Sequence, residues 1–201
     1  MGISVFGIIF IIIIVIGVID TRNENTKFSF SRPDNRKEID ESIAYLRNKR
    51  PVRLRKYQPD ERLYDEFRYN LGDEAVLSRM AADILRHLGL AGNRIPVYVV
   101  DDLEGRAAGR YMSNAYGSSI EIKVQKYTRP NEVMAVLIHE CMHYYLRLTG
   151  LGFEDEHKNE ILTDTATIYF GFYDYIYSGY IHVGYIKDSE IKYINRVLSQ
   201  G

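Results

Sequence analysis

The stretch VLIHECMHYY, Val136–Tyr145, places two histidines four residues apart with a glutamate directly after the first. Residues four apart share one face of a helix, so the imidazoles of His139 and His143 can converge on one metal ion. Glu140 is rotated by about 100° around the helix axis, where it can flank the ion without binding it. The stretch therefore predicts a zinc-bearing helix on which Glu140 takes a proton from a water molecule that the zinc ion polarises.

Two histidines leave a zinc ion short of a third protein ligand. Downstream, the stretch NEILTD, Asn159–Asp164, places Glu160 and Asp164 four residues apart on a second predicted helix. Glu160 is expected to complete the ligand set, and Asp164 is expected to accept the outer N–H of a ligand histidine and fix its tautomer. Two alternatives stay open: His157, one turn earlier, is the third ligand, or the acidic residues are only a solvated helix start.

The pair HECMH and NEILTD resembles the signature of the gluzincin metallopeptidases, which is His-Glu-x-x-His plus a later Asn-Glu-x-x-x-Asp on a second helix. The resemblance implies the two motif histidines and Glu160 as zinc ligands, Glu140 as general base and Asp164 as a supporting residue. The small size and the short sheet expected before the motif helix are most similar to the compact minigluzincins and the ImmA/IrrE-type peptidases. The resemblance covers Ile95–Tyr173, with a shorter gap between the motifs than in thermolysin-like members.

The N-terminal run Gly2–Ile19 contains no charged residue, and Ser4 is its only polar side chain. At about 1.5 Å per residue, a helix of this length just crosses a hydrocarbon core of about 30 Å, which predicts a single-pass transmembrane anchor over residues 1–20. A cleaved signal peptide is the alternative, although no basic residue precedes the run. Basic residues follow it at Arg22, Lys27, Arg32, Arg36 and Lys37. Because cytoplasmic flanks are enriched in such residues, the body is expected to face the cytoplasm.

Residues 21–35 are polar, contain Pro33 and show no periodicity, which is typical of a linker. The remaining residues, 36–201, are expected to form one zincin-like metallopeptidase domain. Helices are expected over residues 36–50, 60–71, 73–88, 130–148, from 156 into a tyrosine-rich segment, and 188–198. Strands are expected over residues 94–100, 105–112 and 119–125, the second with glycines that suggest close backbone approach. This order predicts an α+β fold in which a small, mainly antiparallel sheet precedes the zincin-type active-site helix and the glutamate-bearing helix.

Composition narrows the classes of function. The chain has 201 residues and a formal net charge of -1, which argues against a protein that binds nucleic acid. Its single cysteine, Cys141, excludes an intramolecular disulfide and any cysteine metal cluster. One run is strongly basic, RNKRPVRLRK at Arg47–Lys56. Such a run is usually a solvated surface, and contact with anionic lipid headgroups is the alternative.

Together these features predict a membrane-anchored, cytoplasm-facing zinc metallopeptidase that hydrolyses peptide bonds in a peptide or a flexible protein segment. By the resemblance, the strand AAGRYM, Ala107–Met112, is the candidate for pairing with extended substrate. An electrophile for the oxyanion is expected among Tyr116, His157, Tyr169, Tyr173 and His182. Two other hypotheses are a catalytically silent zinc-binding interaction module tethered to the membrane, and a regulator that cleaves a repressor.

Overall fold

The structure of the protein is a computed structural model that describes residues 34–103, 107–115, 117–126, 128–179 and 185–200. The predicted anchor, Gly2–Ile19, and nearly all of the predicted linker lie outside the described residues, so both stay predictions. Within the described ranges, no helix has the length and apolar character that crossing a bilayer requires.

Three described helices precede the sheet, and each begins and ends close to the predicted positions. They are α1 (Arg36–Lys49), α2 (Glu61–Tyr69) and α3 (Glu74–His87). α1 buries Ile39, Ile43 and Leu46, the residues whose helical spacing predicted it. The side chains of Asp60 and Asp73 cap α2 and α3 by accepting backbone N–H groups of the first turn, which would otherwise lack partners.

The sheet has three strands in the part of the chain that the structure describes: β1 (Val97–Val100), β2 (Gly109–Asn114) and β3 (Gly117–Lys123). Their order is β1-β3-β2, with β2 antiparallel to β3 and β1 parallel to β3. The sheet is therefore mixed, and the expectation of a mainly antiparallel sheet is right for only one of the two pairings. Alternating apolar residues look the same whichever way the neighbouring strand runs, so the pattern does not reveal the parallel pairing.

Four described helices follow the sheet: α4 (Pro130–Leu148), α5 (Glu156–Tyr169), α6 (Tyr173–Gly179) and α7 (Asp188–Ser199). Pro130 opens α4 in the first turn, where its missing N–H costs nothing. The tyrosine-rich segment forms part of two helices where one was expected. The reason is Gly171, whose φ of 95° lies in the left-handed region and ends the first of them.

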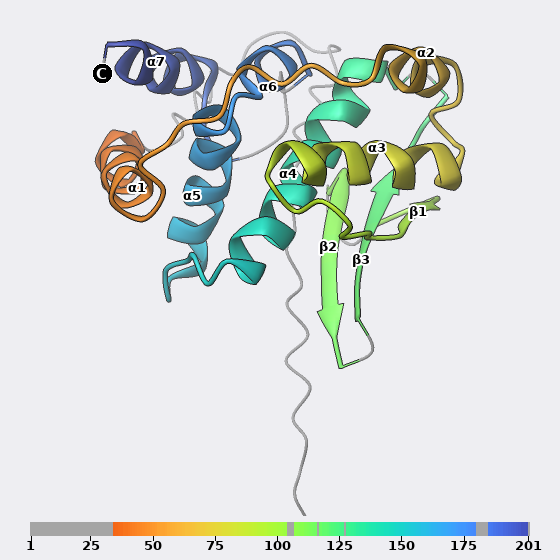
Figure 1. Ribbon diagram of the computed structural model, residues 1–201, viewed down its shortest axis with the longest axis horizontal. Coiled ribbons are helices and arrows are strands. Elements are labelled where there is room, and N and C mark those ends of the chain that lie inside the picture. Colours follow the sequence, from red (N-terminus) through yellow and green to blue (C-terminus); the bar gives the residue numbers. More distant parts are fainter. Residues whose placement is uncertain (1–33, 104–106, 116, 127, 180–184, 201) are drawn as a thin grey trace, which may run out of the picture.

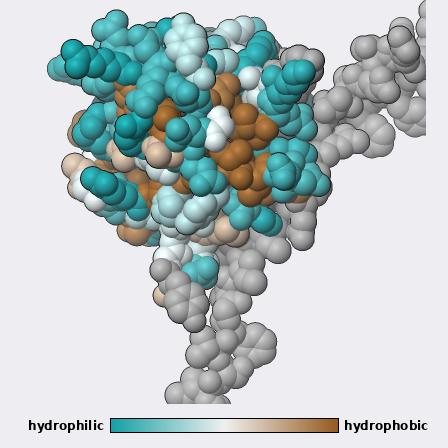
Figure 2. Space-filling view, turned by 90° about the vertical axis from the view of Figure 1, so that its right-hand side faces the viewer, coloured by the Kyte–Doolittle hydropathy of each residue, from teal (hydrophilic) through white to brown (hydrophobic). Residues whose placement is uncertain are grey.

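α4 forms the centre of the fold (Figure 1). It packs against β2 and β3 on one side and against α5 and α6 on the other, while α1 and α7 both pack against α5. Figure 2 shows the molecule from the side of α2 and β1, where hydrophilic side chains surround a small apolar area. The motif helix is thus enclosed between the sheet and α5, and most of its side chains are buried.

Candidate metal centre

Three side chains from two helices converge inside the fold. His139 and His143 project from α4, and Glu160 projects from the first half of α5. The two Nε2 atoms are 2.9 Å apart, and Glu160 Oε2 lies 3.5 Å from His139 Nε2 and 3.6 Å from His143 Nε2. All three residues are buried, and their ligand atoms lie within 4.8 Å of one another, so the group can hold a metal ion.

The hydrogen bonds behind the histidines fix which ring nitrogen carries a proton. His139 Nδ1 lies 2.9 Å from Asp164 Oδ1, and a carboxylate oxygen accepts, so Nδ1 of His139 is the donor. The hydroxyl of Thr163 gives its only proton to the carbonyl of Asn159 at 2.8 Å. The same hydroxyl lies 3.3 Å from His143 Nδ1. Because its proton is already donated, the hydroxyl can only accept a hydrogen bond from His143, so Nδ1 of His143 is also a donor.

When both rings are neutral, these tautomers leave the Nε2 atoms of the two histidines as lone-pair acceptors that face each other and Glu160. Glu160 Oε2 has no hydrogen-bond partner among the described residues. Three such acceptors repel one another unless a cation lies between them. Tetrahedral ligands at about 2.0–2.1 Å from an ion are roughly 3.4 Å apart, so both distances to Glu160 fit an ion. The distance of 2.9 Å between the two Nε2 atoms is shorter, so it has to increase slightly when the ion binds.

The same contacts set the charges of the cluster. Burial alone lowers the pKa of His139, but its hydrogen bond to Asp164 and the nearby carboxylate of Glu160 outweigh burial and raise this pKa well above 6.5. Burial alone raises the pKa of Glu160, but the neighbouring His143 and His139 lower it to about 2. The carboxylate of Glu160 is therefore charged at neutral pH and attracts a cation, either a proton on His139 or a metal ion.

Glu140 lies beside the cluster without joining it. Its carboxylate is fully buried, and both oxygens lack a hydrogen-bond partner among the described residues. Burial raises the pKa of Glu140, and the nearby histidines only partly oppose this shift. The nearby backbone N–H of Tyr111 also lowers the pKa of Glu140, although the two groups do not have the geometry of a hydrogen bond. A buried carboxylate without hydrogen-bond partners destabilises a fold.

The edge strand β2 lies directly against Glu140. A Cβ atom added to Gly109 would come within 2.4 Å of Val136 Cγ1 and 2.9 Å of Glu140 Oε1. Only glycine allows the backbone of β2 to approach α4 this closely. The ring of Tyr111, also on β2, is nearly parallel to the ring of His143, with 6.4 Å between their centroids. β2 therefore forms one wall of the candidate site.

A chain of hydrogen bonds joins the candidate metal centre to the beginning of the described chain. The backbone N–H of Tyr185 donates at 3.1 Å to Asp164 Oδ2, the carboxylate oxygen that does not contact His139. The side chain of Asn35 donates to the carbonyl of Tyr185 at 3.1 Å, and its backbone N–H donates to Glu190 Oε1 at 2.8 Å. Asn35, Asp164 and Glu190 are buried and Tyr185 is half-buried, so the bond to Glu190 is shielded from water and the two bonds of Tyr185 are shielded in part.

The structure brings together five residues that the sequence singled out: His139, Glu140, His143, Glu160 and Asp164. His157, the alternative third ligand, is exposed and outside the cluster, and its ring packs against Tyr185 with 5.7 Å between centroids. The electrophile stays unassigned. Tyr116 and His182 lie outside the described residues, and Tyr169 donates its hydroxyl proton to a backbone carbonyl at 2.6 Å.

Sequence reasoning missed the roles of two residues, Thr163 and Gly109. Thr163 lies inside NEILTD, three residues after Glu160, and this spacing places it on the helical face of the ligand. A glycine in a strand, such as Gly109, signals close backbone approach, but the sequence does not show which residue the backbone approaches. In both cases the missing information is a contact between segments far apart in the sequence.

Thr163→Val is expected to lower metal affinity by about 10–100-fold, the usual cost of losing a group that supports a ligand histidine. Valine has the shape of threonine but accepts no hydrogen bond, so Nδ1 of His143 loses its acceptor and the ring loses its fixed orientation. Thr163→Ser keeps the hydroxyl and is the matched control. A competition titration against a chromophoric metal chelator measures the affinities. Equal values for all three proteins would contradict this role of Thr163.

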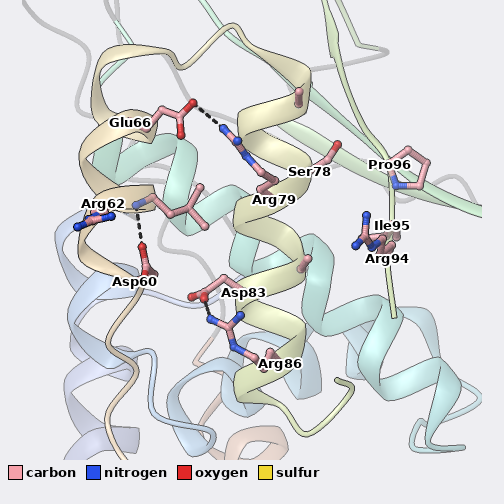
Figure 3. A pocket seen from close by; sticks show the side chains of 13 residues that line it. Asp60, Arg62, Glu66, Ser78, Arg79, Asp83, Arg86, Arg94, Ile95 and Pro96 are labelled. Atoms are coloured by element: carbon pink, nitrogen blue, oxygen red, sulfur yellow. Dashed lines mark hydrogen bonds and ion pairs between the residues drawn. The ribbon is translucent and has the colours of Figure 1, made fainter. Parts of the chain in front are cut away.

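A cavity of about 850 Å³ lies elsewhere, between α2, α3 and the residues before β1 (Figure 3). Its lining shares no residue with the metal cluster. Two of its arginines already have acidic partners: Arg79 pairs with Glu66 at 2.6 Å, and Arg86 pairs with Asp83. The cavity is therefore a surface hollow crossed by ion pairs and adds nothing to the candidate site.

No family model matches the chain, and the comparisons with curated proteins and with solved structures found no match. The likeness to gluzincins therefore stays an expectation from HECMH and NEILTD. The case for a function rests on the geometry of the cluster, on Glu140 and on β2.

Proposed function

We propose that this protein is a membrane-tethered zinc metallopeptidase that hydrolyses peptide bonds in an extended segment of its substrate. One observation carries the proposal: three lone-pair acceptors converge beside a buried carboxylate that has no described hydrogen-bond partner, next to an edge strand. The acceptors can hold a metal ion, the carboxylate of Glu140 can move a proton, and β2 can hold a peptide. The membrane tether rests on the apolar run Gly2–Ile19.

The donor set favours zinc. Two imidazole nitrogens and one carboxylate oxygen are usual donors of a catalytic zinc ion, whereas calcium and magnesium prefer oxygen donors. His139, His143 and Glu160 would hold the ion, while Asp164 and Thr163 would keep the two rings oriented. When bound, the ion supplies Lewis-acid polarisation of a water molecule and of the substrate carbonyl.

Glu140 is assigned as the general base. A base works best when its pKa lies close to the working pH, and burial raises the pKa of Glu140 in that direction. Its oxygens have no described hydrogen-bond partner to release first. The carboxylate can therefore accept a proton from water and pass it to the amine that leaves. The catalytically silent alternative explains a bound metal equally well, but it gives no reason for this buried carboxylate.

β2 is assigned as the strand that binds the substrate. Within the described chain it pairs only with β3, so its other edge presents backbone N–H and C=O groups to a partner. An extended peptide can add to such an edge through main-chain hydrogen bonds. Because Gly109 of β2 lies against Glu140, a peptide on this edge is held next to the base.

Gly109→Ala is expected to lower peptide cleavage by at least tenfold while the metal stays bound. The added Cβ has to push away either β2 or Glu140, and a displacement of about 1 Å at an active site can cost about 10²-fold in rate. Gly72→Ala is the matched control, since a Cβ there meets nothing within 4 Å. Cleavage of a fluorogenic peptide and metal content are measured together. Unchanged cleavage by the Gly109 variant would contradict the assignment of β2.

The direct test of the proposed function is cleavage of a peptide library by the purified full chain. Cleavage should stop when a chelator removes the metal and should return when zinc is restored. A folded, zinc-loaded protein that cleaves no member of broad libraries would favour the silent interaction module instead.

A further inference from the structure

We propose that the segment Arg47–Lys56, here named the basic strap, docks on the anionic lipid headgroups of the membrane that holds the apolar run Gly2–Ile19. The strap contains six basic residues and no acidic residue. This inference rests on the membrane tether of the proposed function, and it is independent of the metal centre. It assigns an interaction surface to the one strongly basic run of the sequence.

Most of the charge on the strap has no carboxylate partner. Lys56 pairs with Asp174, and it is the strap's one cation with an ion pair among the described residues. Lys49 and Arg55 are exposed and have no described carboxylate partner. A dense, uncompensated positive charge of this kind attracts anionic lipid, and each basic residue near the surface adds to the attraction.

Backbone hydrogen bonds hold the strap in a fixed position. The carbonyl of Arg50 accepts the hydroxyl proton of Tyr169 at 2.6 Å, and the backbone N–H of Tyr57, just past the strap, donates to the carbonyl of Gly171 at 2.9 Å. A Cβ at Gly171 would come within 2.3 Å of the Arg55 carbonyl, so the chain is pressed against the turn between α5 and α6. A fixed strap loses little conformational entropy when it docks.

An apolar side chain projects from the middle of the strap. Val52 is 76% exposed, between Pro51 and Arg53, which are exposed as well. An isolated exposed valine needs no explanation, but one surrounded by unpaired cations has the composition of a membrane-interface contact. The cations meet the headgroups while the valine enters the boundary with the acyl chains. Nucleic acid is the less suitable partner, because the chain as a whole carries a net charge of -1.

The path of the chain brings the strap to the bilayer. Asn35 is fastened to Glu190 in the first turn of α7, while Arg47 and Arg53 donate to carbonyls in the last turn of α7. Glu190 and Val197 are seven residues apart on α7, so these two points lie about 11 Å apart. The chain from residue 20 to residue 33 spans at most roughly 50 Å. The tether therefore keeps the strap within reach of the headgroups at a high effective concentration.

The experiment uses the full chain, inserted in lipid nanodiscs, with an environment-sensitive dye attached to Val52→Cys. The dye labels this position alone, because Cys141 is the one other cysteine of the chain and is 0% exposed. Emission should shift to shorter wavelength in discs that contain phosphatidylserine and not in discs of phosphatidylcholine alone. High salt should reverse the shift. A dye at Tyr98→Cys, a position on β1 that is 46% exposed, is the control and should not respond.

A second variant tests the charges themselves. Lys49→Gln with Arg55→Gln should lower the ratio of docked to free protein by roughly fivefold for each cation removed. Melting temperature and metal content should match those of the unchanged protein, which separates a failure here from a failure of the metal centre. The proposal is overturned by equal emission in both lipids, by an equal response at Tyr98, or by a chain that does not insert. An oligonucleotide that produces the shift in place of lipid would also overturn it.

Discussion

Replacing Glu140 with glutamine should lower the rate of peptide cleavage by at least 10²- to 10⁴-fold, the usual contribution of general-base catalysis. Glutamine has nearly the same shape and keeps an oxygen toward the water, but it cannot accept a proton. Glu140 is not one of the converging ligand atoms, so zinc content should stay near that of the unchanged protein. The variant also removes a buried, unpaired charge, so the fold should be at least as stable.

Two measurements on the same sample decide this prediction: the kcat/KM for a fluorogenic peptide and the zinc content. Glu154→Gln is the matched control, since Glu154 is exposed and should not affect either value. Cleavage that survives Glu140→Gln at full rate would end the assignment of the base. Loss of zinc together with activity would mean that Glu140 supports the metal and would leave its role as a base without evidence.

Glu160→Ala should remove most of the zinc, whereas His157→Ala should leave zinc content unchanged. Glu160 Oε2 is one of the three converging donor atoms, so its loss should cost more than the 10–100-fold that a supporting residue costs. His157 is exposed, and its ring faces Tyr185 instead of the cluster. Metal analysis and a chelator competition titration give both values. If the His157 variant loses the metal and the Glu160 variant keeps it, the ligand set is wrong.

The helices of this fold are predictable because their signals are local. Ile39, Ile43 and Leu46 recur at helical spacing, Pro51 follows the end of α1, and Pro130 begins α4. The direction of β1 is not local, because it depends on which strand becomes its neighbour after the chain folds. The same holds for the break at the end of α5, where Gly171 adopts a left-handed φ within a run of aromatic residues.

The candidate site, too, is predictable only where its signals are local in the sequence. The spacing of His139 and His143 on one helix, and of Glu160 and Asp164 on another, shows in the sequence which side chains share a face. The sequence does not show that α5 turns Glu160 toward α4 while His157, one turn earlier, points to solvent. These facts depend on how two helices pack, and packing is set by the whole core.

The hydrogen bonds of Asn35 have a mechanical consequence. If the N-terminal run is held in a bilayer, tension on the chain passes into the described residues through Asn35, which is hydrogen-bonded to Glu190 and to the carbonyl of Tyr185. Tyr185 in turn holds Asp164, which orients His139. A pull that breaks these hydrogen bonds of Asn35 would therefore weaken the support of His139. Proteolytic removal of the chain up to this residue would release the same support without force.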